Sequence, residues 1–209
     1  MGETYETYKE KNGNRIIKIM FDEYPDNPRD WDNVGVMITS HGNYTSPDEL
    51  GINFDDFKGW GEIEEHLFKE HDAALVLPIY MYDHSGVALN TTGFSCPWDS
   101  GQYGLIMVTN AKLKEEGISK EKAKSILENE VETFGNYING DVLQYVLYEI
   151  KKVKVNKVYQ DGSSKDYEEE ELENVDSCCG FYGTSRETIQ HIFESAGLNI
   201  DDFEEVEEK

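Results

Sequence analysis

The stretch Ala73–Tyr82, AALVLPIYMY, decides the fold of this chain. It is the most apolar segment of the 209 residues, and its β-branched and aromatic side chains predict a buried strand. It is too short to cross a membrane, because a spanning helix needs about 18 or more apolar residues in a row. Pro78 has no backbone N–H to give to a neighbouring strand, so it predicts a bulge or an edge position within this strand.

Strand and helix patterns continue on both sides of this segment. Apolar runs and period-2 alternation predict further strands over residues 15–21, 34–40, 86–92, 103–109, 141–150, 153–159 and 174–182. Apolar residues at helical spacing predict helices over residues 60–71, 110–116, 119–137 and 184–196. A turn is expected at residues 160–163, and the runs before it are expected to be antiparallel strands. The chain therefore predicts an α+β fold, a mainly antiparallel sheet with about three helices packed on it.

The expected domain organisation is simple. The chain has no internal repeat and no Gly/Ser-rich linker, and 209 residues suffice for one domain with a sizeable core. We therefore expect a flexible N-terminus over residues 1–13, a single α+β domain over residues 14–198 and an acidic tail over residues 199–209.

The composition is strongly acidic, with 43 Asp and Glu against 19 Lys and Arg and a formal net charge of −24. Such a chain cannot hold nucleic acid by counterion release, which needs clustered Lys and Arg, and an anionic membrane surface repels it. Aromatic residues make up 12% of the chain, which is more than an acidic disordered protein carries. The composition therefore indicates a folded body with an acidic surface, and it excludes direct binding of nucleic acid or membrane.

Two acidic runs near the C-terminus carry much of this charge, Asp166–Glu173 and Asp201–Glu208. One interpretation is a solvated loop and a frayed tail. Another is an array of carboxylates that stands in for phosphates and faces a basic groove, and adaptation to high salt is a third. For the array, the candidate partner-binding residues are Glu168, Glu169, Glu170, Glu171, Glu173, Asp201, Asp202, Glu204 and Glu205. A second candidate face consists of Asp55, Asp56, Glu62, Glu64 and Glu65.

The loops after the apolar strand carry candidate chemistry. The three residues of Asp83–Ser85 are adjacent, so on an extended chain they point to opposite faces and cannot form a catalytic triad by themselves. His84 can instead pair with Cys96 or Asp99 from the next loop, which would give a small hydrolytic site. A cysteine nucleophile needs a base and a lowered pKa, and negative surroundings oppose this. The alternative is structural, with Pro97-Trp98 in a buried, rigid turn.

The spacing of cysteine and histidine predicts no metal centre. Cys178 and Cys179 are adjacent, which makes them poor joint ligands of one tetrahedral zinc, and the chain has no C-x2-C or H-x3-H pair. The glycine-rich fingerprints of phosphate loops and dinucleotide sites are also absent from the sequence. We therefore expect no resident metal and no cofactor.

Several motifs occur together in this chain: NPRDWDN at residues 27–33, LPIYMYDHSG at 77–86, FSCPWDSGQYG at 94–104, GDV at 140–142 and DSCCGFYG at 176–183. With these motifs, over roughly residues 14–183, the chain resembles a family of small proteins carried by phages, plasmids and conjugative elements. The resemblance lends no catalytic residues. It implies a setting inside a bacterium, where a mobile genetic element meets restriction enzymes and RNA-guided nucleases with basic channels.

These observations predict an inhibitor of a host nuclease, of anti-CRISPR or antirestriction type, that blocks a basic nucleic-acid-binding channel by DNA mimicry. A small hydrolase that uses the His84 site is the first alternative. The second is an accessory protein of the mobile element that binds a partner through Trp31, Trp60 or Trp98. The N-terminal sequence lacks an apolar signal segment and the three cysteines form no disulfide framework, so the expected location is the cytoplasm of the bacterial host.

Overall fold

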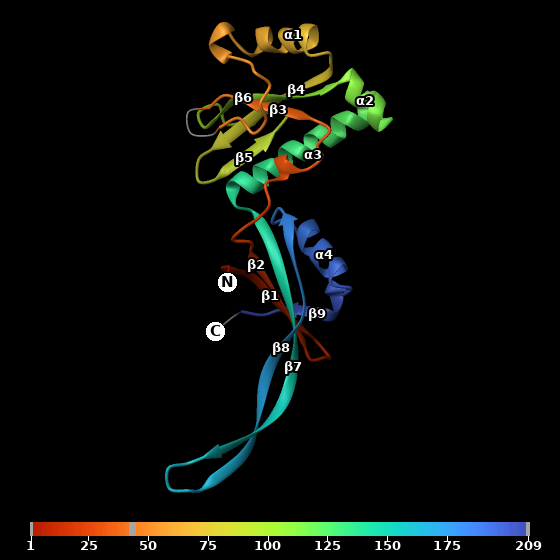
Figure 1. Ribbon diagram of the computed structural model, residues 1–209. Helices are drawn as coiled ribbons and strands as arrows, with labels where there is room; N and C mark the ends of the chain where they lie inside the picture. Colours follow the sequence, from red (N-terminus) through yellow and green to blue (C-terminus); the bar gives the residue numbers. More distant parts are fainter. Residues whose placement is uncertain (1, 42–44, 208–209) are drawn as a thin grey trace. The chain divides into compact units, whose positions relative to one another are not determined.

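Antiparallel strands and helices occur where the sequence patterns place most of them (Figure 1). The computed structural model describes residues 2–41 and 45–207, and within these ranges it holds four α-helices and nine strands in two antiparallel sheets. The predicted α+β class is confirmed. Contacts within the chain group it into two compact units, the central unit Asp26–Gly140 and the terminal unit Met1–Pro25 with Asp141–Lys209, whereas the sequence predicts one domain over residues 14–198.

The apolar stretch forms β4 (Ala73–Asp83), an inner strand of the central unit. Its sheet has the order β3-β6-β4-β5, with β3 at Val36–Thr39, β5 at Val87–Asn90 and β6 at Ser100–Thr109. The helices of this unit are α1 (Trp60–Glu70), α2 (Asn110–Glu116) and α3 (Lys120–Asn139), with the short 3-10 helices η1 (Pro28–Asp30) and η2 (Phe54–Asp56).

Both faces of the central sheet are covered, with α1 and α3 on opposite sides (Figure 1). On one side, Ile79 and Ile106 of the sheet form a buried cluster with Leu127 of α3. On the other side, Leu105 of the sheet forms a second cluster with Ile63 of α1. Because both faces are buried, the inner strands are continuously apolar instead of alternating between apolar and polar residues.

Pro78 lies where the missing N–H costs no ladder hydrogen bond. β5 pairs with β4 only over Tyr80–Asp83, so β4 is an edge on that side at Pro78. The register between β4 and β6 also shifts between Ile79 and Tyr80. The prediction of a bulge or an edge position at this proline is confirmed.

The terminal unit is built on a five-stranded antiparallel sheet in the order β8-β7-β2-β1-β9. Its elements are β1 (Thr4–Glu10), β2 (Arg15–Phe21), β7 (Val142–Val158), β8 (Ser164–Tyr182), α4 (Arg186–Ser195), the 3-10 helix η3 (Ile200–Asp202) and β9 (Phe203–Glu205). Ile17, Ile19 and Tyr145 from the sheet and Ile192 and Phe193 from α4 belong to one buried cluster, so α4 covers one face.

Both ends of the chain contribute strands to this sheet, which corrects the prediction of a flexible N-terminus over residues 1–13. β1 pairs with β2 on one side and with β9 on the other. The acidic tail predicted over residues 199–209 contains η3 and β9, and Phe203 is buried with its ring centroid 5.3 Å from that of Phe193. The polar residues of β1 resemble a solvated segment in sequence, and only the flanking strands make them part of a sheet.

An ion pair whose contribution to stability depends on pH joins the end of β1 to the start of β2. Arg15 donates from Nη2 to Glu10 Oε1 at 2.5 Å and from Nε to Glu10 Oε2 at 3.0 Å. These hydrogen bonds from Arg15, against the opposing effect of partial burial, lower the pKa of Glu10. A folded-state pKa below the unfolded value adds stability above the unfolded value, and this stability is lost as the pH falls through the folded value.

We therefore expect acid to destabilise the terminal unit through Glu10. The urea midpoint of the β1 and β2 amide signals, followed by NMR, should fall as the pH drops below about 4.3, the ordinary glutamate pKa. The Glu10→Gln variant lacks this titration, so its midpoint should depend less on pH over the same window. Equal pH dependence in the two proteins would contradict the assignment.

Strands β7 and β8 continue past the rest of the sheet as a two-stranded ribbon (Figure 1). β2 pairs with β7 only as far as Glu149, and among the described residues β7 is paired beyond this point with β8. We call residues 150–173 the arm. At about 3.3 Å per residue, a ribbon of this length extends roughly 30 Å from the sheet.

The arm corrects two predictions about the second half of the chain. The runs 141–150 and 153–159, expected as separate strands, are continuous in β7, because Lys151-Lys152 between them offers no turn-forming residue. The acidic run Asp166–Glu173 lies in β8, so its interpretation as a solvated loop is wrong. The turn expected at residues 160–163 is present, with the N–H of Gly162 bonded to the carbonyl of Tyr159 at 3.0 Å.

Candidate functional site

Pairing of β4 with β6 brings the candidate hydrolytic residues together. Tyr82 near the end of β4 lies opposite Ser100 at the start of β6. His84 directly follows β4 and Asp99 directly precedes β6, so the two side chains meet at the same end of the sheet. Cys96 reaches the same place from the loop before β6.

The carboxylate of Asp99 lies between the other two groups. Its Oδ2 atom is 3.4 Å from Sγ of Cys96, which donates to it, and 3.7 Å from Nδ1 of His84. A cysteine hydrolase needs the imidazole beside the sulfur, where it can take the thiol proton. The order thiol–carboxylate–imidazole brings the predicted residues together, but it places the carboxylate of Asp99, and not the imidazole of His84, beside the thiol.

A cavity of about 310 Å³ lies beside Asp99 and is lined also by His41, Asp83, Trp98 and Tyr103. The Trp98 side chain is 92% exposed, so the expectation of a buried turn at this residue is wrong. The loop is instead held by a hydrogen bond of 2.5 Å from Ser100 Oγ to the carbonyl of Cys96.

The other two tryptophans considered as partner contacts differ in exposure. Trp31 is about half exposed, while Trp60 at the start of α1 packs against Phe54 with ring centroids 5.7 Å apart. Trp98 and Trp31 are therefore the tryptophans that offer apolar surface to a partner.

Arg29, within the NPRDWDN motif of residues 27–33, is a buried charge that the sequence patterns did not predict. Its side chain is 3% exposed and binds two carboxylates. Nη2 and Nε donate to Asp48 Oδ2 and Oδ1 at 2.6 and 3.3 Å, and Nη1 donates to Glu130 Oε2 at 3.0 Å. Nη2 also donates to the carbonyl of Gly35 at 2.7 Å.

Both carboxylate partners of Arg29 also accept hydrogen bonds from backbone N–H groups. Asp48 accepts the N–H of Met37 at 2.6 Å, and Glu130 accepts the N–H of Val34 at 2.8 Å. Burial lowers the pKa of Arg29, but the hydrogen bonds and charges of the two carboxylates outweigh this and raise it. The network joins η1, β3 and α3, so this motif has a structural role here.

The acidic run of β8 does not form a single array. Successive side chains of a strand point to opposite faces, so Glu168 and Glu170 lie on one face of the arm and Glu169, Glu171 and Glu173 lie on the other. A groove of another protein that contacts one face therefore meets only part of the run.

Lysines of β7 lie across the ribbon from these carboxylates. Lys151, Lys152 and Lys154 are opposite Glu171, Glu170 and Glu168, respectively. The ammonium of Lys151 forms an ion pair with Glu173, whose hydrogen bonding raises the pKa of this lysine. The arm contains seven carboxylates and five lysines, so most of its negative charge is balanced locally.

The tail acids lie far from the arm acids in the order of the sheet. β9 and β8 are its two opposite edges. Glu204 is opposite Lys9 of β1, and Lys11 binds the carbonyls of Asp201 and Asp202 through Nζ and its N–H at 2.8 and 2.9 Å. The two C-terminal acidic runs therefore form two separate surfaces.

The residues of the second predicted acidic face all lie in η2 and α1, which follow each other in the chain. Its residues Asp55, Asp56, Glu62, Glu64 and Glu65 are all exposed. Residues 53–70 carry six carboxylates and two lysines, and those lysines approach Glu62 at 3.8 Å and Glu65 at 3.1 Å. We call this surface the α1 face. It has a larger uncompensated charge than the arm.

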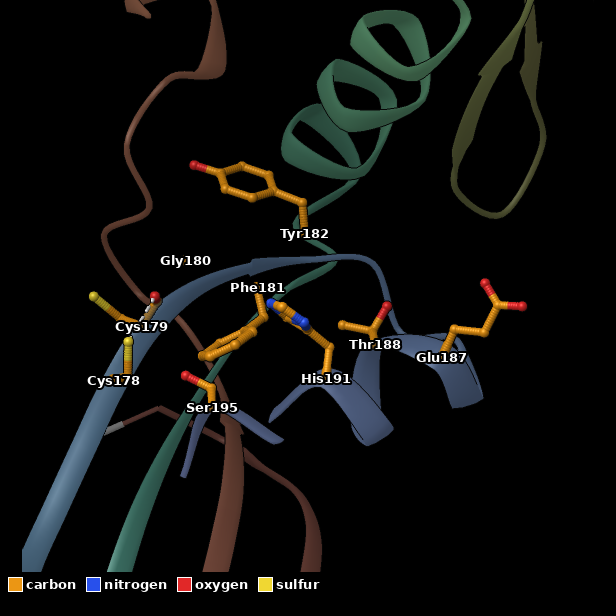
Figure 2. Close-up of a pocket in the computed structure, with 9 residues that line it drawn as sticks. All are labelled: Cys178, Cys179, Gly180, Phe181, Tyr182, Glu187, Thr188, His191 and Ser195. Atoms are coloured by element: carbon orange, nitrogen blue, oxygen red, sulfur yellow. Dashed lines mark hydrogen bonds between the residues drawn. The ribbon is translucent and has the colours of Figure 1, made fainter. Parts of the chain in front are cut away.

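A further cavity of about 530 Å³ lies between the end of β8 and α4, as Figure 2 shows. It is lined by Cys178, Cys179 and Phe181 from the strand and by His191 and Ser195 from the helix. The sequence patterns did not predict that His191 lies beside these cysteines. In the described part of the chain, no three His, Cys, Asp or Glu side chains are grouped closely enough to hold a metal ion.

A buried tyrosine lies close to this cavity. Tyr145 donates from its hydroxyl to Asp176 Oδ2 at 2.6 Å. Burial and the neighbouring Asp176 raise the pKa of Tyr145 to about 12, so the phenol stays protonated at neutral pH. It serves as a hydrogen-bond donor in the core of the terminal unit.

Comparison of the chain with protein-family models, with curated proteins and with solved structures finds no match. The resemblance to proteins of mobile genetic elements thus stays a prediction. None of the helices in residues 2–41 and 45–207 combines the length and the apolar character that crossing a membrane requires.

Proposed function

We propose that the protein inhibits a host nuclease, of RNA-guided or restriction type, by occupying the basic channel that otherwise binds nucleic acid. The observation that carries this proposal is the α1 face, whose exposed carboxylates are held on regular structure. The charge of the whole chain agrees with it. The terminal unit has 23 acidic and 11 basic residues and the central unit 20 and 8, so each has a formal charge of −12.

The α1 face meets the physical requirements of a channel blocker. Ile63 and Leu67 are buried against the sheet, so α1 is fixed and its outer carboxylates keep their spacing. Arg and Lys side chains in a channel would bind such carboxylates by charge-assisted hydrogen bonds. The negative field also speeds the approach to a basic partner, an effect that salt screens. The arm supports this role less well, because its acids lie opposite lysines of β7.

The proposal predicts that reversing the charge of the α1 face abolishes inhibition. In the variant with Asp55, Asp56, Glu62, Glu64 and Glu65 replaced by Lys, five surface carboxylates are reversed while the buried residues of α1 stay. Cleavage of target DNA by guide-loaded and restriction nucleases would be titrated with each protein, at about 50 and about 200 mM salt. Wild type should inhibit stoichiometrically and more weakly at high salt, and the variant should not inhibit.

A matched variant separates the α1 face from net charge. Replacing Glu168, Glu169, Glu170, Glu171 and Glu173 by Lys makes the same charge change on the arm. This protein should still inhibit. Full inhibition by the α1-face variant, with its circular dichroism unchanged, would overturn the proposal. Equal loss of inhibition in both variants would show that net charge, and not the α1 face, is responsible.

A small hydrolase is the second candidate function, favoured by the meeting of His84, Cys96 and Asp99. The channel-blocking proposal predicts that the double variant Cys96→Ala, His84→Ala retains stoichiometric inhibition, because neither residue belongs to the α1 face. The same cleavage titration measures it. Inhibition by wild type at far less than one molecule per nuclease, lost in the double variant, would favour the hydrolase instead.

A further inference from the structure

The outer edge of β8 is open along the arm. β8 pairs with β7 from Val142↔Tyr182 to Val158↔Ser164, and it is an edge strand of the five-stranded sheet. Its residues from Ser164 to Gly180 are all exposed. The N–H and C=O groups that point away from β7 therefore face solvent, and such a row can pair with an added strand.

The arm lacks the packing that a stable ribbon needs. A two-stranded ribbon is marginal in water without a third strand or a covering element. The arm also exposes apolar side chains, since Tyr167 and Leu172 on β8 and Val158 and Tyr159 at its tip are between 39% and 69% exposed. An added strand would supply the missing neighbour and cover part of this surface.

The charges of β8 decide which strand can be added. Six carboxylates lie between Asp166 and Glu173 on the two faces of β8, and the lysines that balance them are on β7. Each residue of a strand added to the outer edge would lie opposite a residue of β8. Opposite charges in such cross-strand pairs attract and like charges repel, so the edge selects Lys and Arg.

A second copy related by a two-fold axis does not fit the edge. Two β8 edges related by a two-fold axis would set one acidic run against the other. Two β7 edges of the arm would likewise set Lys151, Lys152, Lys154 and Lys157 against their own copies. A uniformly charged edge of this kind also discourages self-assembly of open strands.

We propose that the outer edge of β8 over Asp166–Glu173 binds an extended, Lys/Arg-rich segment of a partner protein as a third strand of the arm. This surface is separate in sequence from the α1 face. The binding does not depend on the nuclease proposal, and the two are tested by different variants.

The test uses the full chain and the synthetic peptide KVKKTKVK, with fluorescence anisotropy for affinity and NMR hydrogen exchange for location. The basic peptide should bind and slow exchange of the amides over Asp166–Glu173. The acidic peptide EVEETEVE should not bind. The basic peptide with alternate amides N-methylated keeps its charge but cannot form the hydrogen bonds of a strand pair. It should bind at least about tenfold more weakly, since main-chain hydrogen bonds supply the affinity in strand addition.

Two variants with the same charge change locate the edge. Replacing Glu168, Glu169, Glu170 and Glu171 by Lys should abolish binding, whereas replacing Asp201, Asp202, Glu204 and Glu205 by Lys should leave it unchanged. Equal affinity for the N-methylated peptide would overturn the proposal in favour of charge attraction alone. Protection of the β8 amides without peptide, together with self-association in analytical ultracentrifugation, would overturn it in favour of a second copy.

Discussion

Replacing Arg29 with methionine is expected to lower the free energy of unfolding of the central unit by about 3–5 kcal/mol, the usual cost of removing one partner from a buried ion pair. The guanidinium is 3% exposed and serves two carboxylates and the carbonyl of Gly35. Its loss leaves Asp48 and Glu130, themselves largely buried, without their counter-ion. Tryptophan fluorescence during urea unfolding reports this unit, because all three tryptophans lie within Asp26–Gly140.

A triple variant distinguishes the uncompensated charge from the lost packing. Arg29→Met combined with Asp48→Asn and Glu130→Gln removes all three charges but keeps acceptors for the N–H groups of Met37 and Val34. It should recover a large part of the stability lost in the single variant. A single variant as stable as wild type would show that the network does not hold the central unit together.

Truncating Phe203 to alanine is expected to destabilise the terminal unit by about 3–5 kcal/mol, the usual range for a buried phenylalanine. The ring is 4% exposed and lies edge-on to Phe193 of α4. Its loss leaves a cavity beneath β9, whose register with β1 runs from Tyr8↔Glu205 to Glu10↔Phe203. Urea unfolding followed through the NMR amide signals of β1 and β2 measures the effect.

The neighbouring acids provide the control for Phe203. Glu204→Gln and Glu205→Gln change only exposed side chains, so stability should shift by less than about 0.5 kcal/mol. If the alanine variant also kept its stability, β9 would be a tail that merely lies against the sheet.

The sequence patterns predicted the elements whose own residues are apolar enough to indicate burial. The strand at residues 73–82 and the one at residues 15–21 are apolar enough to be identified without knowledge of their partners. β1 and the acidic part of β8 are too polar to be identified in this way. Glu and Lys are depleted in strands, so the strand pattern of Asp166–Glu173 becomes visible only when the lysines of β7 are seen opposite.

The sequence predicted that the residues of the candidate site lie near one another, but it did not predict how their side chains are arranged. His84 and Asp99 flank two strands that pair, so their meeting followed from the order of the elements. That Asp99 and not His84 lies beside Cys96 depends on side-chain positions that no spacing encodes. Arg29 was missed for a different reason, because a charged residue in a proline-rich turn is ordinarily a surface residue.

β1 and β2 of the terminal unit are synthesised before the central unit, but the terminal unit can be completed only after the central unit has been made. The central unit is one uninterrupted segment of 115 residues, whereas the terminal unit needs strands from both sides of that segment. At about 5–20 residues per second, β1 and β2 wait roughly 6–23 s before β7 begins to emerge. A lone hairpin is marginal in water. During synthesis the central unit therefore can fold first, while β1 and β2 remain available to chaperones until β7 and β8 have been made.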